Sequence, residues 1–195
     1  MIVLGITGGI GSGKSTVSKI LSVLGVPVYI ADDESKKLTD SSPIIREKLT
    51  ALLGDDLYID NKLNKAKLAS IIFSDQKKLE QVNAIIHPEV QNHFLKWVEN
   101  QRNKQHNIAA CETAILFESG FDRFTDKSVT IYSPLEIRID RITRRDNCTR
   151  EKAQERINSQ MPDEKKVELS DFIIVNNEDK SLIEQTIQLI EQLQQ

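Results

Sequence analysis

The most constraining feature of the sequence is a glycine-rich segment, residues 8–15, that stands between an apolar stretch and an amphipathic one. Residues 1–6 are almost continuously apolar, which predicts a strand buried on both faces. After the glycines, apolar side chains within residues 17–24 recur at the spacing of one helical face. A further apolar stretch, residues 26–31, predicts a second strand. Strand, glycine loop, helix and strand in this order predict an α/β protein with a parallel sheet.

The glycine segment matches the pattern G-x-x-x-x-G-K-[ST] of phosphate-binding loops (P-loops). In such a loop the glycines let backbone N–H groups turn inward, and the start of the following helix adds its positive dipole end. Lys14 can reach the β- and γ-phosphates, and the Ser15 hydroxyl can ligate Mg²⁺. We therefore predict binding of a nucleoside triphosphate, with these contact residues: Gly11, Ser12, Gly13, Lys14, Ser15 and Thr16. No glycine has an aspartate three residues before it, which argues against a switch GTPase.

Two acidic residues follow predicted strands at the sheet edge where α/β proteins bind ligands. Asp32 ends the second strand, and Glu112 follows the apolar run 108–111. A carboxylate there can accept a proton from an acceptor hydroxyl or hold Mg²⁺ through water. A helix cap or an ordinary surface charge is the alternative for both residues.

Arginines are concentrated in one stretch: six of the nine in the chain lie between Arg138 and Arg156. Arg138, Arg141 and Arg145 are spaced to share one helical face. A solvated charged face is one interpretation. The other is a lid whose guanidinium groups neutralise charge on a transferring phosphoryl group. Because like charges repel, we expect such a lid to be loosely held until ligands draw it closed.

The remaining elements are predicted from local signals. Residues 33–101 show helical periodicity and no evident strand, with one helix from Pro43 to a stop at Gly54 and separate helices before and after Pro88. Strands are predicted at 108–111, 129–132 and 172–175. The last helix opens with the capping box Ser181-x-x-Glu184 and is predicted to turn three isoleucines inward: Ile183, Ile187 and Ile190.

Composition limits the partners. With 195 residues and a net charge of −3, the chain lacks the basic excess of general nucleic-acid binders, so we expect no nucleic-acid partner. No apolar run is long enough to span a bilayer, and the N-terminus does not resemble a signal peptide, so we expect no membrane partner. We predict a cytoplasmic protein and a monomer, with an oligomer left open.

The assembled motifs resemble the dephospho-CoA kinase family, a branch of the P-loop nucleotide kinases. The resemblance runs from end to end of the chain, and its most specific pieces are the His-Pro and Arg-x-x-x-Arg-Asp motifs. The matching segments are Gly5–Val17, Leu24-Gly25, Ala31-Asp32, Asn83-x-x-x-His87-Pro88, Leu116-Phe117-Glu118, Arg141-x-x-x-Arg145-Asp146, Gln160 and Asn176.

The resemblance implies transfer of the ATP γ-phosphoryl group, with Mg²⁺, to the ribose 3′-hydroxyl of dephospho-CoA, the last step of coenzyme A synthesis. It implies a three-layer α/β/α P-loop core formed by residues 1–32, 91–140 and 165–195, a helical acceptor domain at 33–90 and a lid at 141–164. It also implies residue roles: Asp32 as the base, Lys14, Arg141 and Arg145 as catalytic cations, Asn176 near the adenine, and Lys36 and His87 on the acceptor. For His87 a helix cap is the alternative.

Four positions depart from the family pattern. Lys36 stands where the family usually has an arginine that helps hold the acceptor. Ile30 replaces the first acid of an Asp-Ala-Asp motif, Ala114 replaces a proline, and Arg138 replaces a common glutamine. The base is retained. A nucleoside or nucleotide kinase with another acceptor, or a non-catalytic nucleotide-binding switch, are the alternatives; a switch would have no use for a base.

Overall fold

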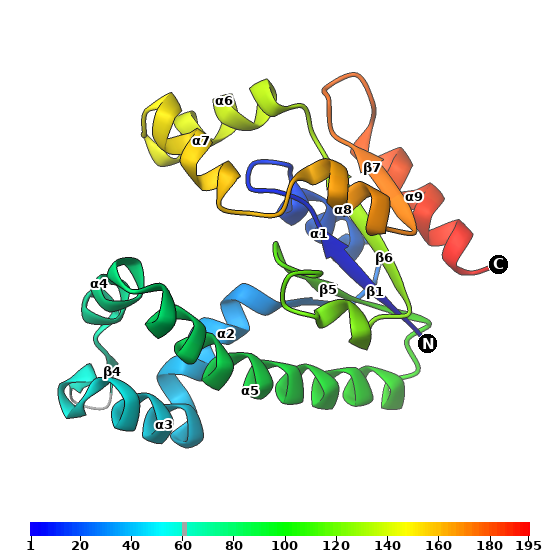
Figure 1. The fold of residues 1–195 in the computed structure, drawn as a ribbon. Coiled ribbons are helices and arrows are strands. Elements are labelled where there is room, and N and C mark those ends of the chain that lie inside the picture. Colours follow the sequence, from blue (N-terminus) through cyan, green and yellow to red (C-terminus); the bar gives the residue numbers. More distant parts are fainter. Residues whose placement is uncertain (60–61) are drawn as a thin grey trace. The chain divides into compact units, whose positions relative to one another are not determined.

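The computed structural model describes residues 1–59 and 62–195, which divide into two compact units (Figure 1). The first unit comprises Met1–Ile30 and Trp97–Gln195, and the second comprises Ala31–Lys96. A long helix, α5 (Gln76–Asn103), has residues in both. The assignment of an acceptor domain to 33–90 and of a lid to 141–164 stays a prediction.

A five-stranded sheet forms the centre of the first unit, in the order β2-β5-β1-β6-β7, with every neighbouring pair parallel. Its strands are β1 (Ile2–Thr7), β2 (Val28–Ile30), β5 (Ile108–Glu112), β6 (Lys127–Tyr132) and β7 (Phe172–Val175). The predicted parallel α/β fold and its strands are confirmed. The chain crosses first to one side of β1 and later to the other, so the crevice for a ligand lies at the carboxyl end of that strand.

Helices cover both faces of this sheet, which explains why β1 and β5 are apolar along their whole length. The helices of this unit, besides the end of α5, are α1 (Lys14–Val23), α6 (Leu135–Asp146), α7 (Arg150–Asn158), α8 (Asp163–Leu169), α9 (Leu182–Leu193) and the 3₁₀ turn Phe121–Phe124. Helices α1 and α9 share a core with one face (Figure 1). On the other face, Trp97 of α5 lies 5.5 Å from Tyr29 between ring centroids, and α8 contacts β6.

Helix α9 begins as predicted, because the Ser181 hydroxyl accepts a hydrogen bond from the Glu184 N–H. Of the three isoleucines predicted to turn inward, Ile190 packs against the core, and the prediction is wrong for the other two. Ile183 and Ile187 are 57% and 39% exposed, and the buried face runs instead through Thr186, Leu189 and Leu193. A threonine is tolerated there because its hydroxyl donates to the Leu182 carbonyl at 2.6 Å, which leaves only its methyl to pack.

The second unit is mainly helical. It contains α2 (Ala31–Ser41), α3 (Pro43–Leu53), a 3₁₀ turn (Asp55–Leu57), α4 (Lys65–Ser74) and the greater part of α5. Helix α3 is confirmed with both ends, since Ser42 caps it and Gly54 stops it. The expectation of no strand is wrong: β3 (Tyr58–Ile59) and β4 (Lys62–Leu63) form a short antiparallel pair, too brief to produce a visible alternation.

The separate helices predicted on either side of Pro88 are one helix, α5. Proline lacks an N–H, so the carbonyl of Ala84 loses its intrahelical partner. Both Ala84 and Pro88 lie on the solvent side, where water can serve that carbonyl. The opposite side carries an unbroken buried stripe through the proline: Val82, Ile86, Val90, Phe94 and Val98. Continuous burial therefore outweighs the local breaker.

Candidate active site

The glycine loop connects β1 to α1 at the carboxyl end of the central strand. Gly13 caps α1 in a left-handed conformation, with φ of 100°. A side chain there would be strained and would overlap the amide of Asn176, so only glycine fits. The first N–H groups of α1 have no partner within the helix, and with its positive dipole end they form an anion site. Ser15 and Thr16 lie exposed in this first turn.

Carbonyl groups of the loop are held from outside by three side chains that come from distant parts of the chain. Arg138 Nε donates to the Ile10 carbonyl at 2.9 Å, Arg141 Nη1 to Gly11 at 3.3 Å and Asn176 Nδ2 to Ser12 at 2.7 Å. The carbonyl and the N–H of one peptide point in opposite directions. Fixing the carbonyls of Ile10 and Ser12 therefore directs the N–H groups of Gly11 and Gly13 away from these contacts.

Lys14 lies over the same loop. Its ammonium donates to the carbonyls of Gly8 at 2.8 Å and Gly9 at 3.3 Å. A charged group held at the mouth of an anion site by two neutral carbonyls can exchange them for phosphate oxygens, which bind an ammonium more strongly.

Arg141 and Asn176, both predicted site residues, contact each other and the loop. The Asn176 side-chain oxygen accepts from Arg141 Nη2 at 3.1 Å, and Arg141 also donates to the Ser133 hydroxyl at 3.3 Å. Asn176 closes the end of β7 through its backbone, since its N–H donates to Tyr132. Its predicted place near the adenine stays a prediction. What the structure adds is its contact with the loop.

The arginines between Arg138 and Arg156 differ in how far their side chains are buried. Arg145 is largely exposed and donates to Asp146 at 2.7 and 3.1 Å, an arrangement that raises the pKa of the guanidinium and lowers that of the carboxyl. The expectation that these arginines repel one another is wrong, because each has a carboxylate partner. The pairs are Arg138–Asp163, Arg141–Glu178, Arg144–Asp140, Arg145–Asp146, Arg150–Glu136 and Arg156–Asp146.

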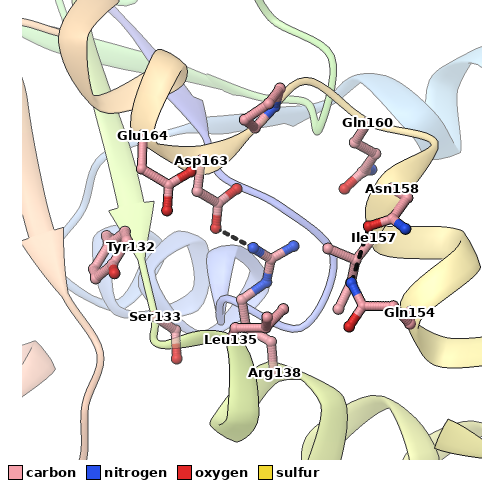
Figure 2. Close-up of a pocket in the computed structure, with 11 residues that line it drawn as sticks. Tyr132, Ser133, Leu135, Arg138, Gln154, Ile157, Asn158, Gln160, Asp163 and Glu164 are labelled. Atoms are coloured by element: carbon pink, nitrogen blue, oxygen red, sulfur yellow. Dashed lines mark hydrogen bonds and ion pairs between the residues drawn. The ribbon is translucent and has the colours of Figure 1, made fainter. Parts of the chain in front are cut away.

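Arg138 and Asp163 form an ion pair between α6 and α8, beside the loop (Figure 2). Both are 5% exposed. Burial, which penalises the charged forms, lowers the pKa of Arg138 and raises that of Asp163. The pair lies on the wall of a cavity of about 420 Å³ lined by residues of α6, α7 and α8. Figure 2 shows Arg138 and Asp163 among the residues that line it. Gln160, between α7 and α8, accepts a hydrogen bond from the Ile10 N–H at 2.8 Å.

Glu112 is the last residue of β5 and pairs in register with Ile6, next to the start of the loop. It is buried, and its Oε2 has no hydrogen-bond partner among the described residues. A buried carboxylate oxygen without a partner is costly, and a bound cation or a water molecule would satisfy it. Glu118, farther along the same segment, is different: it holds the fully buried ammonium of Lys166 at 2.6 Å.

The other predicted residues belong to the second unit. Asp32 is exposed in the first turn of α2 with two further acids, two residues after β2. Lys36 is exposed in the same helix and pairs with Asp33 at 3.1 Å. His87 lies in α5, half-buried, and burial lowers its pKa.

Sequence reasoning missed several side chains that pair or pack around the site. Asp163 follows a proline at a helix start, and no pattern in the sequence indicates that it pairs with Arg138, which lies 25 residues earlier. Lys166 is the central charged residue of a short polar helix, and its complete burial contradicts the usual exposure of lysine. Gln160 could have been found from the resemblance, where it was one of the matching residues.

Within residues 1–59 and 62–195, no helix has both the length and the apolar character that a membrane crossing requires.

Known proteins resemble the chain over nearly its whole length. A family model described as dephospho-CoA kinase matches residues 2–181. A dephospho-CoA kinase of Bacteroides fragilis is 48% identical over 189 residues, which cover 97% of this chain and 91% of that protein. A crystal structure from Thermus thermophilus gives a TM-score of 0.84 at 29% identity, covering 98% of this chain and 96% of that one. Dephospho-CoA kinase from Campylobacter jejuni gives 0.72 at 26% identity, with the same two coverages.

Proposed function

Because the chain belongs to the dephospho-CoA kinase family, we propose that it transfers the γ-phosphoryl group of ATP to the ribose 3′-hydroxyl of dephospho-CoA, giving coenzyme A and ADP. The observation that carries this proposal is the glycine loop, with its carbonyls held from outside and Lys14 over its mouth. Phosphoryl transfer needs mainly positioning and charge stabilisation from a protein. The loop supplies both.

The loop N–H groups and the start of α1 bind the phosphates of ATP. Lys14 leaves the Gly8 and Gly9 carbonyls for the β- and γ-phosphate oxygens and balances their growing charge during transfer. Arg141, already fixed to Gly11 and Asn176, presents its guanidinium beside the same loop. Asn176 and the turn after it then lie nearest the nucleoside half of ATP.

Mg²⁺ fits two of the residues present. The Ser15 hydroxyl is exposed in the first turn of α1, and the unpartnered Glu112 oxygen lies at the end of the neighbouring strand, suited to contact through water. Bound there with ATP, Mg²⁺ would neutralise phosphate charge. Asp32 is the alternative metal contact through water.

Asp32 is the proposed base. It is an exposed carboxylate that follows β2 by two residues, and it forms no ion pair with the described residues. A carboxylate can accept the proton of the attacking 3′-hydroxyl as the bond to phosphorus forms. Because Asp32 lies in the first turn of α2, its backbone is held by the helix.

The second unit is the proposed acceptor domain, with Lys36 and His87 as contacts for dephospho-CoA. Lys36 is exposed and, within the described part of the chain, pairs with Asp33 on its own helix, so its ammonium is available to a phosphate of the acceptor. His87 has a pKa lowered by burial and is therefore neutral at pH 7, suited to hydrogen bonding rather than charge pairing.

Residues 141–164 are the proposed lid, with Arg145 as its catalytic cation. Asp146 holds Arg145 in the absence of substrate, so closure requires the guanidinium to exchange this carboxylate for a phosphate. We further propose that the protein acts as a cytoplasmic monomer on ATP and dephospho-CoA, with no nucleic-acid or membrane partner.

The test is an acceptor screen that measures ADP release from ATP and Mg²⁺. We expect release with dephospho-CoA and little with adenosine, AMP or shikimate at equal concentration. Lys14→Ala is the control for contaminating kinases. Equal activity with another nucleoside would replace the proposed acceptor, and absence of turnover with every acceptor, despite ATP binding, would favour a nucleotide-binding switch.

A further inference from the structure

The contribution of an ion pair to stability does not by itself explain the buried pair of Arg138 and Asp163. Both groups are buried, and burial opposes the charged form of each. Buried ion pairs are often no more stabilising than apolar residues of the same volume, because desolvation offsets their attraction. What distinguishes this pair is its contact with the loop: the same guanidinium that meets Asp163 donates from Nε to the Ile10 carbonyl at 2.9 Å.

The loop is shaped to accept this pair. A Cβ on Gly9 would overlap both the Arg138 guanidinium and the Asp163 carboxylate, so the loop backbone approaches them at a distance that only glycine allows. The backbone of Arg138 lies near Gly11, where a Cβ would come within 2.9 Å of the Arg138 carbonyl oxygen. On the far side, Gln160 accepts from the Ile10 N–H at 2.8 Å. The peptide groups on both sides of Ile10 are therefore fixed by side chains from other segments.

We propose that Arg138 and Asp163 are positioning residues for the glycine loop: Asp163 orients the guanidinium, and the guanidinium holds the Ile10 carbonyl so that the following N–H faces the phosphates. Neither residue touches the nucleotide. The inference rests on the proposed binding of ATP phosphates by this loop. It assigns to Arg138, a position where the sequence departs from its family, a role apart from the exposed lid arginines.

Two double variants separate positioning from stability. In an Asp163→Leu background, Arg138→Gln and Arg138→Met both remove the buried charges. The Gln side-chain nitrogen stands at the same number of bonds from the backbone as Arg Nε, so it can still donate to Ile10. Met has the same length and no donor. The two proteins therefore differ at the one hydrogen bond to the loop.

We expect both double variants to unfold within about 5 °C of the parent protein, since an ion pair of little net value is replaced by an apolar pair in the Met variant and by a neutral side chain that keeps the Ile10 hydrogen bond in the Gln variant. Single Asp163→Leu, which leaves the arginine buried and unpaired, should lower Tm by roughly 6–20 °C. For Mg·ADP binding by calorimetry, the Met double variant should bind roughly three- to tenfold more weakly than the parent. Its kcat/KM should fall about 10- to 100-fold. The Gln double variant should stay within about threefold of the parent in both.

A Met double variant that binds ADP and turns over like the parent would show a purely structural pair and overturn the proposal. Equal losses in the Gln and Met variants would overturn it as well, because the hydrogen bond to Ile10 would then be irrelevant. If neither folds, the same comparison is made in an Asp163→Asn background, with the same expected order. Lys127→Gln, which removes an exposed ion pair at the opposite end of β6, is the control and should change neither measurement.

The proposed function is tested separately by the parent protein. If the parent binds no Mg·ADP, the proposed role of the loop fails. If the parent binds and the variants do not separate, only the positioning role fails.

Discussion

Replacing Glu112 and Glu118 by glutamine should change the stability of the protein in opposite directions. Glu112 is buried and its Oε2 has no partner in the described chain, whereas Glu118 neutralises the buried ammonium of Lys166 at 2.6 Å. Replacement by glutamine preserves the size of each side chain and removes its charge. The substitution therefore tests whether Glu112 is retained for a cation rather than for the fold.

The expected magnitudes follow from these surroundings. An unsatisfied buried polar atom costs about 1–3 kcal/mol, and more if charged, so Glu112→Gln should stabilise the cation-free protein by about 1 kcal/mol. In a chain of 195 residues this raises Tm by roughly 2–4 °C. Glu118→Gln leaves Lys166 with the neutral Ala114 carbonyl as its remaining recorded partner, and should cost roughly 3 kcal/mol and 6–12 °C.

The assay is thermal unfolding in EDTA, followed by turnover over a range of Mg²⁺ concentrations. Glu112→Gln should lower kcat/KM roughly tenfold or more at low Mg²⁺, with partial recovery at high Mg²⁺, because a carboxylate contact to the ion is lost. A fall in Tm of several degrees, or turnover equal to the parent at every Mg²⁺ concentration, would refute the argument that Glu112 awaits a cation.

Four further outcomes are expected. Lys14→Ala should lower kcat roughly 10²–10³-fold in a coupled ADP assay, with an unchanged circular dichroism spectrum, because it removes a charge-assisted contact of the transition state. Asp32→Asn should lower turnover about 10²–10⁴-fold while calorimetry still detects ATP binding; turnover within a few-fold of the parent would make Asp32 a cap. Arg145→Ala should lower turnover more than it weakens ATP binding. Hydrogen exchange over residues 141–160 should slow when both substrates are bound, and an exchange rate that does not respond to substrates would contradict the lid. For His87, burial places the pKa of the folded state below the unfolded value of about 6.5, so the unfolded state binds more protons. The free energy of unfolding should therefore decrease as pH falls through this range. Denaturant unfolding at pH 5 and 7.5 should show this decrease, and the decrease should be smaller in His87→Gln.

The sequence predicted what local chemistry determines. The glycine loop, the buried strands and the caps of α3 each depend on residues within a few positions of one another, so their patterns are legible without the fold. Helix α5 was divided in error because proline is a strong local signal, whereas the buried stripe that overrides it becomes decisive only when packed. The face of α9 was misjudged for a similar reason, since hydropathy alone ranks isoleucine above a threonine whose hydroxyl is satisfied internally.

Local sequence patterns do not predict ion pairs and hydrogen bonds between side chains that lie far apart in the sequence. Three of the arginines in the run, Arg138, Arg150 and Arg156, have carboxylate partners on another helix, and these pairs form only when α6, α7 and α8 pack together. Of the candidate site, the glycine loop and its place between β1 and α1 could be predicted from the sequence. The side chains that hold the loop could not, because nothing in the pattern of a loop specifies what lies behind it.

The glycine pattern encodes a loop able to bind phosphate, and the rest of the fold makes that loop stiff. Its glycines give up backbone entropy on folding more than any other residue, so a bare loop would sample many shapes. Three side chains from α6 and the end of β7 each take one carbonyl, at Ile10, Gly11 and Ser12. Dipoles fixed before the nucleotide arrives need no reorganisation during transfer, which is the condition under which they stabilise a transition state most. The loop therefore depends for its catalytic value on residues outside its own motif, and substitution of Arg138 should lower turnover without removing a phosphate contact.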